Sequence, residues 1–329
     1  MKHVLLLKFF ELAEITTAIL DAKEALDDHQ LVAIPTETVY GLAANGSSEI
    51  ALKKIFTAKG RPANNPLILH FKNLDAIAPY VKEISAQTKL LAENFWPGPL
   101  TLLLEKSDQV PPIVTAGSPR VAVRVPNHPI TLELLKSLEY PLAAPSANPS
   151  GYISPTTAQH VAAQLGDKIP FILDGGPCTS GIESTILGWE GATPIIYRKG
   201  VITSEQIDSV LGTYPEFNTN SEVLEAPGML SSHYAPNTPT IVTESVEKTV
   251  LEQQDKKIGL ILFNENSQLG VTKEVVLSKT GSLTEMAKNL YAAMRQLDTL
   301  SLDVLIIEKA PDEGIGKAIN DRLKRSSFR

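Results

Sequence analysis

A proline-rich segment that begins at Thr213 divides the chain into two parts of unequal length. Four prolines, from Pro215 to Pro239, lie in this segment among asparagine, serine and glycine residues, a composition typical of a linker. On both sides of it, short apolar runs alternate with stretches of helical spacing, which predicts α/β units. The sequence therefore predicts a larger α/β domain over residues 1–212, a linker over 213–238 and a small α/β domain over 239–329.

Composition limits the kinds of site that this chain can carry. Of its 329 residues, 43% are hydrophobic and 20% are charged, so a full core can be buried. The net charge of −7 argues against a general nucleic-acid coat, so an anion site would be a local basic pocket. Cys178 is the single cysteine, which excludes a disulfide framework and a cysteine-based zinc site. Glu11 and Glu14 interrupt the apolar start, so we expect no signal peptide, no membrane span and a cytoplasmic protein.

The alternation of apolar runs and amphipathic stretches predicts the order of the elements. Strands are expected at residues 31–34, 67–71, 100–105, 120–126, 142–144, 171–174, 194–200, 240–242, 257–263, 274–277 and 303–307, with one more ending at 187. Helices are expected at residues 16–29, 47–56, 73–81, 85–95, 129–138, 156–165, 203–211, 283–297 and 315–325.

Two cations flank a glycine at Lys59 and Arg61, in a turn that Pro62 and Pro66 stiffen. Arginine can donate two parallel hydrogen bonds to a phosphate and lysine offers a point charge, so this turn is a candidate phosphate site. The alternative is a solvated basic turn between a helix and a strand, since charged turns are common. The strand that follows carries His70, which in such a position is more often a core residue than a site residue.

Polar side chains accompany two other expected strands. The first expected strand runs into a turn with Thr36 and Thr38, at the strand end where open α/β sheets bind ligands; a capped turn is the alternative. Further along, Arg120 and Arg124 share one face of a strand whose other face carries valines. Buried arginines are costly without anions, so this pair either reaches solvent or lines an anion-binding pocket.

A third polar run, with Ser146, Asn148 and Ser154, follows the expected strand at 142–144. Its hydroxyl and amide groups would suit a phosphate or a ribose, whereas the alternative is a turn with a helix cap at Ser154.

Inside the linker, His233 and Tyr234 form an aromatic pair that is unusually specific for a tether. We predict that the linker folds over the mouth of the cavity as a lid, and a passive tether is the alternative.

Several familiar motifs are absent from the sequence. The run G-I-G-K at 314–317 lacks the full spacing of a phosphate-binding loop, and no G-x-G-x-x-G follows an early strand. There is no zinc-ligand spacing and no G-x-S-x-G nucleophile motif. A nucleotide would therefore be bound without either of the common nucleotide loops.

Short motifs occur in a fixed order along most of the chain: P-T-E-T-V-Y-G-L at 35–42, K-G-R-P at 59–62, N-P-L-I-L-H at 65–70, V-A-V-R-V-P at 121–126, A-P-S-A-N-P-S-G at 144–151, E-S-T-I at 183–186, Y-R-K-G at 197–200, S-H-Y-A-P at 232–236 and G-I-G-K-A-I-N-D-R-L at 314–323. Their ordered combination resembles the threonylcarbamoyl-AMP synthase family in its long form. The resemblance implies an α/β (α+β) fold: a YrdC-like twisted mixed sheet with helices around a concave basic cavity, and a small Rossmann-like C-terminal domain.

The resemblance also implies a reaction, in which L-threonine, bicarbonate (or CO2) and ATP give threonylcarbamoyl-AMP and pyrophosphate. A separate tRNA-modifying transferase complex then passes the threonylcarbamoyl group to the adenosine beside the anticodon. Magnesium is expected on the pyrophosphate side, held by phosphate oxygens and water, and no protein ligand for a metal is predicted. The residues agree with such chemistry, because they include cations and hydroxyls but no paired nucleophile and base.

The resemblance assigns roles position by position. It implies that the catalytic residues are Lys59 and Arg61. It implies that L-threonine contacts Thr36, Thr38, His70, Arg124, Ala144 and Ser184. It implies that ATP contacts Lys59, Arg61, Asn65, Arg120, Ser146, Asn148, Ser154 and Arg198, with His233 and Tyr234 from the linker. Arg120 stands where many relatives have a smaller hydroxyl residue.

Two other functions remain open from the sequence. One is an RNA-binding module that uses the basic concave surface, with the tail from Arg322 to Arg329 as a possible weak tRNA contact. Scattered cations and a negative net charge argue against a continuous basic stripe. The other is a carbamoyl-transfer enzyme of hydrogenase maturation, a family that adds cysteine-rich zinc motifs. A single cysteine argues against that assignment.

Overall fold

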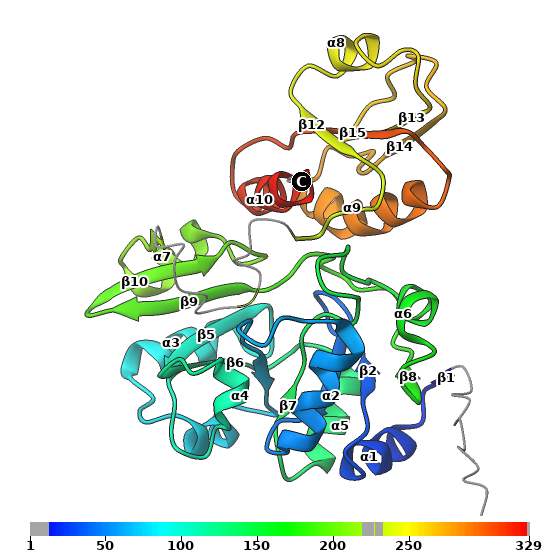
Figure 1. The fold of residues 1–329 in the computed structure, drawn as a ribbon. Helices are drawn as coiled ribbons and strands as arrows, with labels where there is room; N and C mark the ends of the chain where they lie inside the picture. Colours follow the sequence, from blue (N-terminus) through cyan, green and yellow to red (C-terminus); the bar gives the residue numbers. More distant parts are fainter. Residues whose placement is uncertain (1–12, 219–226, 228–232, 328–329) are drawn as a thin grey trace, which may run out of the picture.

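The fold is described from a computed structural model, which defines residues 13–218, 227 and 233–327. The chain forms two α/β domains, and the smaller one, yellow to red in Figure 1, stands on the larger one. The apolar start of the chain and much of the expected linker lie outside the described residues.

A mixed sheet runs through the larger domain and, among the described residues, contains eleven strands. Their order is β1-β8-β2-β3-β7-β4-β6-β5-β9-β10-β11. Their bounds are β1 Glu14–Thr16, β2 Val32–Ile34, β3 Gly41–Asn45, β4 Ile68–His70, β5 Leu100–Glu105, β6 Arg120–Arg124, β7 Leu142–Ala143, β8 Phe171–Leu173, β9 Thr185–Glu190, β10 Thr193–Arg198 and β11 Glu216–Phe217.

Helices surround this sheet at α1 Ile19–Asp27, α2 Glu49–Lys59, α3 Ala86–Phe95, α4 Pro112–Thr115, α5 Pro129–Ser137, α6 Ala158–Leu165 and α7 Ser204–Leu211, with a 3-10 helix at Asp75–Tyr80. Local capping explains several of their starts. The Ser48 hydroxyl accepts a hydrogen bond from the Ala51 amide at 3.3 Å, and Thr203 forms a capping box with Gln206. Gly60 ends α2 in the left-handed conformation, which turns the chain toward Arg61.

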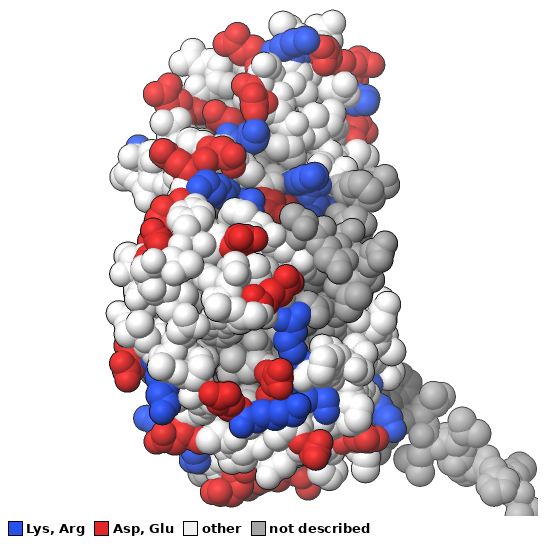
Figure 2. Space-filling view, turned by 90° about the vertical axis from the view of Figure 1, so that its left-hand side faces the viewer, with Lys and Arg blue, Asp and Glu red and all other residues white. Residues whose placement is uncertain are grey.

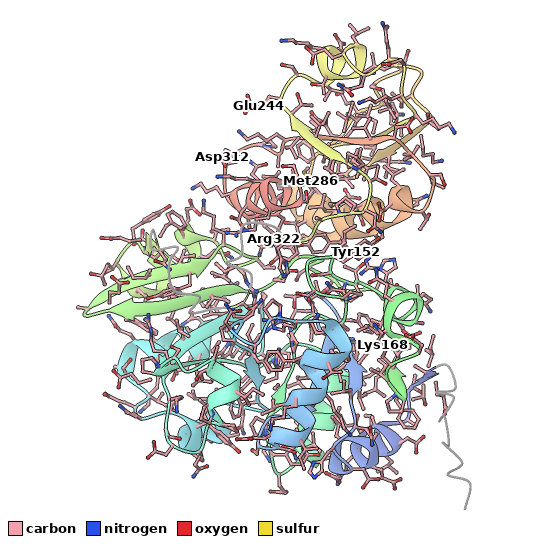
Figure 3. The ribbon with its side chains drawn as sticks, in the orientation of Figure 1. Tyr152, Lys168, Glu244, Met286, Asp312 and Arg322 are labelled. Atoms are coloured by element: carbon pink, nitrogen blue, oxygen red, sulfur yellow. The ribbon has the colours of Figure 1, made fainter. Side chains whose placement is uncertain are left out.

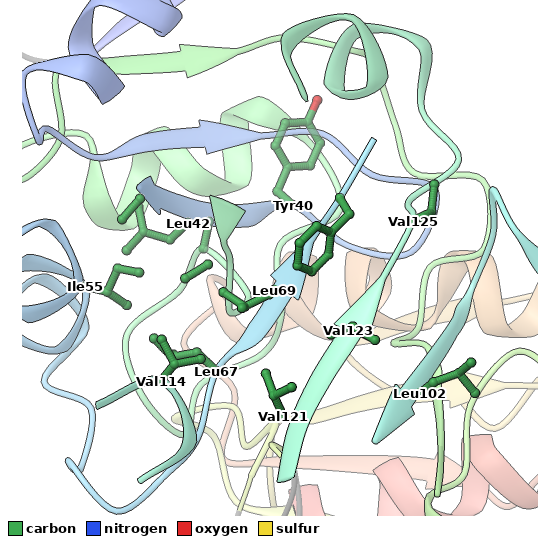
Figure 4. Close-up of a cluster of buried hydrophobic side chains, with 14 of the residues drawn as sticks. Tyr40, Leu42, Ile55, Leu67, Leu69, Leu102, Val114, Val121, Val123 and Val125 are labelled. Atoms are coloured by element: carbon green, nitrogen blue, oxygen red, sulfur yellow. The ribbon is translucent and has the colours of Figure 1, made fainter. Parts of the chain in front are cut away.

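Alternation along β4 and β6 separates the main core from the face that carries His70 and Arg124, as the sequence predicts for β6. The two strands are parallel neighbours, with Ile68 opposite Ala122 and His70 opposite Arg124. Val121 and the residues that alternate with it point to the other face, into the main core. Figure 4 shows this core, in which Leu67, Leu69, Leu102, Val114, Val121 and Val123 gather on one face of the sheet. Burying these apolar groups leaves the opposite face free for polar residues.

The small domain is built on a four-stranded parallel sheet in the order β12-β15-β13-β14. Its elements are β12 Thr240–Thr243, α8 Val246–Leu251, β13 Ile258–Leu262, β14 Lys273–Val276, α9 Leu283–Asp298, β15 Val304–Glu308 and α10 Gly316–Ser326. Helices α9 and α10 cover the face of this sheet that is turned toward the larger domain (Figure 1). None of the helices in the described part of the chain is long and apolar enough to cross a bilayer.

The structure differs from the predicted elements in several places. Strand β3 was not predicted, because glycine and alanine have weak strand propensity. Pairing with β2 and β7 forms the strand nevertheless, and Gly41 leaves room for Ala144, which a Cβ there would meet at 3.1 Å. The expected helix at 16–29 begins at Ile19, after β1, and the expected helix at 73–81 is a 3-10 helix around Pro79. Strands β1 and β11 and helices α4 and α8 were not predicted.

Candidate active site

Four strand ends meet at one edge of the larger sheet. His70 ends β4 and Arg124 ends β6, which runs parallel to β4. Strand β5 runs antiparallel to β6 and parallel to β9, so β9 begins at this edge, directly after Ser184. Strand β10 returns antiparallel to β9 and brings Arg198 back to the same edge. The strand order therefore gathers residues from distant parts of the chain.

A cavity lies at this edge. Its lining includes these predicted site residues: Thr36, Thr38, Arg61, His70, Arg124, Ala144, Ser146, Ser184, Arg198, His233 and Tyr234. It also includes Val39, Gly41, Ile68, Pro145, Glu183 and Pro227. Arg61, Arg124 and Arg198 are each no more than 8% exposed, so these cations are buried. The interpretation of Lys59 and Arg61 as a solvated turn is therefore wrong.

Arg124 is held by groups that surround its guanidinium. Its Nη1 donates to the Thr38 hydroxyl at 3.0 Å, its Nε donates to the Gly98 carbonyl at 3.2 Å, and its Nη2 lies 2.6 Å from Glu37 Oε1. The Thr38 hydroxyl also lies 2.9 Å from the hydroxyl of Thr36. Glu37 was not among the predicted site residues, although it lies between the two threonines. This buried ion pair fixes the direction of the arginine before any ligand binds.

His70 is a neutral imidazole beside this arginine. Burial, together with the positive charge of Arg124, lowers its pKa to about 3. Its Nδ1 lies 3.2 Å from the Ile68 carbonyl oxygen. A neutral ring next to Arg124 adds no positive charge to this end of the cavity.

At the opposite end of the cavity from Arg124, Arg198 donates hydrogen bonds to Ser184, the residue that precedes β9. Its Nε donates to the Ser184 carbonyl at 3.1 Å, its Nη2 donates to the Ser184 hydroxyl at 3.0 Å, and its Nη1 donates to the Pro227 carbonyl at 3.1 Å. The turn after Arg198 packs tightly on the same segment, because a Cβ on Gly200 would lie 2.3 Å from the Thr185 nitrogen. Only glycine permits this approach, which brings Arg198 and Ser184 together.

Asn65 orients Arg61 toward the cavity. The Arg61 Nη2 donates to Asn65 Oδ1 at 2.6 Å and to the Pro66 carbonyl at 2.7 Å, and its Nε donates to the Asn65 carbonyl at 3.2 Å. Burial and repulsion from Arg198 lower the pKa of Arg61 to about 10. Two buried cations that repel each other create an electrostatic demand for an anionic ligand between them. Asn65 itself does not line the cavity.

Three further predicted residues support the cavity wall from behind. The Lys59 ammonium donates to the Ser146 carbonyl at 2.5 Å and to the Asn148 carbonyl, and it does not line the cavity. Burial, with repulsion from Arg61, lowers the Lys59 pKa well below its usual value. The Asn148 amide donates to two backbone carbonyls of its own loop, and the Ser154 hydroxyl donates to Glu183 Oε1 at 2.7 Å. The cap of α6 is Thr157, so the alternative of a cap at Ser154 is wrong.

Arg120 lies away from the cavity, contrary to the prediction. It shares a face with Arg124, but it starts β6 whereas Arg124 ends it. Its Nη1 donates to the Tyr197 hydroxyl at 2.8 Å, and its guanidinium lies 4.9 Å from the Tyr197 ring centre. Alternation predicted the face correctly and could not predict the distance along the strand.

The described end of the linker reaches the cavity. His233 and Tyr234 line it, and their ring centres lie 4.1 Å apart. Tyr234 has a φ of 63°, in the left-handed region, which turns the chain at this point. The His233 Nδ1 and the Tyr234 hydroxyl are buried and have no protein hydrogen-bond partner in the described part of the chain. Such groups are suited to bind a ligand or water.

The buried histidines predict a loss of stability in acid. His233, like His70, has its pKa lowered to about 3, by burial first. The unfolded chain binds protons at about pH 6.5, so stability is full above that pH and is lost as pH falls toward 3. Below about pH 6, each histidine should cost about 1.4 kcal/mol of unfolding free energy per pH unit. Urea unfolding at pH 7.5 and pH 5 measures this, and His70→Asn should show a smaller loss; an equal loss would contradict the assignment.

Comparisons with known proteins agree with this geometry. Two family models match the chain: one described as "Telomere recombination", which groups Sua5, YciO and YrdC, over residues 24–200, and one described as "Threonylcarbamoyl-AMP synthase, C-terminal domain" over 202–327. The threonylcarbamoyl-AMP synthase of Pyrococcus abyssi is 40% identical over 312 residues, which span 91% of this chain and 90% of the relative. The synthase of Bacillus subtilis is 39% identical over 330 residues, which span 96% and 95%.

A solved structure matches the fold as well. The crystal structure of P. abyssi Sua5 complexed with L-threonine superimposes with a TM-score of 0.89 and 39% sequence identity, covering 94% of each chain. Sequence, fold and domain order thus agree over nearly the whole length, so the chain belongs to the threonylcarbamoyl-AMP synthase family, in its two-domain form.

Proposed function

We propose that the chain condenses L-threonine, bicarbonate and ATP to threonylcarbamoyl-AMP, pyrophosphate and water, the activity for which its family is named. The observation that carries the proposal is the convergence of three buried guanidinium groups, those of Arg61, Arg124 and Arg198, on one cavity. Buried cations are stabilised by anions, and a carboxylate and a triphosphate are the anions of this reaction. L-threonine in the structure of the Pyrococcus relative supports the choice of amino acid.

Threonine is proposed to bind at the end of the cavity where Arg124 lies. The guanidinium, already oriented by Glu37 and Thr38, would bind the substrate carboxylate. The deprotonated amine attacks the carbon of CO2 or bicarbonate and forms a carbamate; when bicarbonate reacts, water leaves. A carbamate oxygen then attacks the α-phosphorus, and the bond from that phosphorus to pyrophosphate breaks. The reaction needs no protein nucleophile, because the amine and the carbamate oxygen are themselves the nucleophiles, and the cavity has only to align them.

ATP is proposed to lie with its phosphates between Arg61 and Arg198. These groups are held in place by Asn65 and Ser184, so they can neutralise the charge that passes to pyrophosphate without rearranging. We expect magnesium to arrive bound to the nucleotide, with phosphate oxygens and water as its ligands. In the described parts of the chain, no group of three or more histidine, cysteine, aspartate or glutamate side chains is placed to hold a metal ion.

The product is a mixed anhydride of a carbamic acid and a phosphate, which hydrolyses readily. We propose that it passes to a tRNA-modifying threonylcarbamoyl transferase complex rather than accumulating. A direct contact of this chain with tRNA is not needed for the first step.

The experiment that tests the activity is incubation with MgATP, bicarbonate and each amino acid in turn, followed by mass detection of an aminoacyl-carbamoyl nucleotide. Signal with threonine, and equimolar pyrophosphate, is the expected result. Signal with every amino acid would retain the reaction and reject the specificity, and signal with none would reject the function.

An RNA-binding module is not favoured. RNA binding needs exposed cations along a continuous surface. The cations of the cavity are buried instead, and on the face shown in Figure 2 basic side chains are interspersed with acidic ones. Membership of the threonylcarbamoyl-AMP synthase family also favours an enzyme over an RNA-binding module.

The proposed lid gives a prediction at the linker. His233→Ala should raise KM for ATP about tenfold while the chain remains folded, because the ring lines the cavity and its Nδ1 has no protein partner in the described part of the chain. Steady-state pyrophosphate release measures the effect. Tyr214→Ala, an exposed tyrosine of the same linker, is the control and should behave as wild type. Equal KM values for the two variants would favour the passive tether.

A further inference from the structure

One carboxylate in the cavity wall is shared by the two domains. Glu183 lines the cavity and precedes Ser184. Within its own domain it accepts a hydrogen bond from Ser154 at 2.7 Å. From the small domain it accepts one from the Tyr291 hydroxyl of α9 at 3.0 Å and one from Arg322 Nε of α10 at 2.8 Å. Figure 3 shows Arg322 at the boundary between the domains.

The same guanidinium reaches a second segment of the active site. Arg322 Nη2 donates to the Lys199 carbonyl at 2.8 Å, and Lys199 directly follows Arg198. Arg198 is in turn bonded to Ser184, the neighbour of Glu183. Arg322 thus bonds to the chain on both sides of the Arg198–Ser184 contact.

We propose that Arg322 is a positioning residue for the reaction: its bonds to Glu183 and to the Lys199 carbonyl make the geometry of Ser184 and Arg198 depend on the seated C-terminal domain. This inference rests on the proposed function of the cavity. It gives the small domain a role in catalysis although none of its side chains needs to touch a substrate.

Burial makes this contact sensitive to any change. Arg322 is 1% exposed and Glu183 is 6% exposed, so neither charge can turn to water if the other is lost. Burial by itself would raise the pKa of Glu183, but Arg322, Arg198 and Ser154 hold it at about 2. The other ionisable groups that face this carboxylate are Tyr291, Tyr234 and His233.

Arg322 also packs against Tyr234, in the part of the linker that lines the cavity. Its guanidinium lies 5.1 Å from the ring centre of Tyr234, and the Tyr291 ring stacks on Tyr234 at 5.7 Å. The segment before Glu183 is pressed against the small domain, because a Cβ on Gly181 would lie 2.4 Å from the Lys288 Cα of α9. The two domains therefore pack closely at this point.

Variants of the full-length chain test the proposal by comparing substitutions at two residues of α10, Arg322 and Lys317. Arg322→Gln should lower kcat/KM for threonine about 100-fold, the size expected when reacting groups are misplaced by about 1 Å. Arg322→Lys should recover part of the loss, because it keeps a charge near Glu183 but cannot also reach the Lys199 carbonyl in the same way. Lys317→Gln is the matched control, since Lys317 pairs with Glu205 of α7 at 2.9 Å, across the same domain boundary but outside the cavity lining. It should change kcat/KM less than about twofold.

The pH dependence of kcat/KM distinguishes a positioning role of Arg322 from a role that only stabilises the fold. In Arg322→Gln the unpaired Glu183 should protonate at a higher pH, so the acid limb of kcat/KM should move toward neutral pH. The double variant Glu183→Gln, Arg322→Gln should lose that shift, and Lys317→Gln should never show it. Thermal unfolding of each variant shows whether it is folded.

The outcomes distinguish the inference from the function on which it rests. If the wild-type chain makes no threonylcarbamoyl-AMP, the proposed function fails. If the wild type is active and a folded Arg322→Gln matches Lys317→Gln in rate and pH profile, the inference is overturned. Should Arg322→Gln fail to fold, Tyr291→Phe replaces it, because that change removes one hydrogen bond to Glu183 and keeps the stacked ring. A several-fold loss of kcat/KM with the same acid shift supports the proposal, and wild-type behaviour overturns it.

Discussion

Arg61→Ala should lower kcat for pyrophosphate release by about 10²–10³-fold or more while the chain remains folded. Arg61 is oriented by Asn65 and lies in the cavity near Arg198, where charge would develop on the departing pyrophosphate. Folding should survive, because the substitution removes one of two buried cations that repel each other. Pyrophosphate release at saturating threonine and MgATP measures the effect.

Arg120→Ala is the matched control for this prediction. It removes an arginine of the same domain that the sequence assigned to the nucleotide but that contacts Tyr197 instead. It should retain most of the activity. An unchanged rate in Arg61→Ala would remove Arg61 from the mechanism, and a large loss in Arg120→Ala would return that residue to the nucleotide site.

Arg124→Gln should weaken threonine binding and raise its dissociation constant about 100-fold or more, because a charge-assisted bond to the substrate carboxylate is lost. It should also destabilise the fold by about 3–5 kcal/mol, since Glu37 would remain as a buried, unpaired carboxylate. Calorimetric titration with threonine and urea unfolding measure the two effects.

A double variant separates these effects. Glu37→Gln combined with Arg124→Gln should recover much of the stability, because no unpaired charge remains, and should still fail to bind threonine. Recovery of threonine binding in the double variant would show that Arg124 acts only through the fold. Loss of stability without loss of binding in the single variant would lead to the same conclusion.

Local patterns predicted much of the fold. The alternation around Arg124 identified the strand face that carries the site, and the helices expected from residues 47 and 203 begin at Glu49 and Ser204. These features depend on neighbours a few residues apart in the chain. Strand β3 was missed because its small residues become a strand only through pairing with β2 and β7, which local propensity does not report.

The sequence predicted which types of residue form the site, but it predicted their positions relative to the cavity less well. Most of the assigned residues line one cavity, whereas Arg120 lies elsewhere and Lys59, Asn65, Asn148 and Ser154 lie outside the lining. Motif similarity reports that a residue belongs near a site, without saying whether it faces the ligand or holds a residue that does. The supporting role of Lys59, bonded to the Ser146 and Asn148 carbonyls, could be seen only in three dimensions.

The sequence by itself determined that this chain forms α/β units, which strand face carries polar groups, and which motifs place it among its relatives. These follow from side-chain periodicity and from residue order, both of which are written along the chain. The tertiary structure alone decided which cations share one cavity. It alone decided that Glu183 accepts hydrogen bonds from Tyr291 and Arg322 of the other domain. Strand order and domain docking bring together residues more than a hundred positions apart, and burial then makes their charges depend on one another.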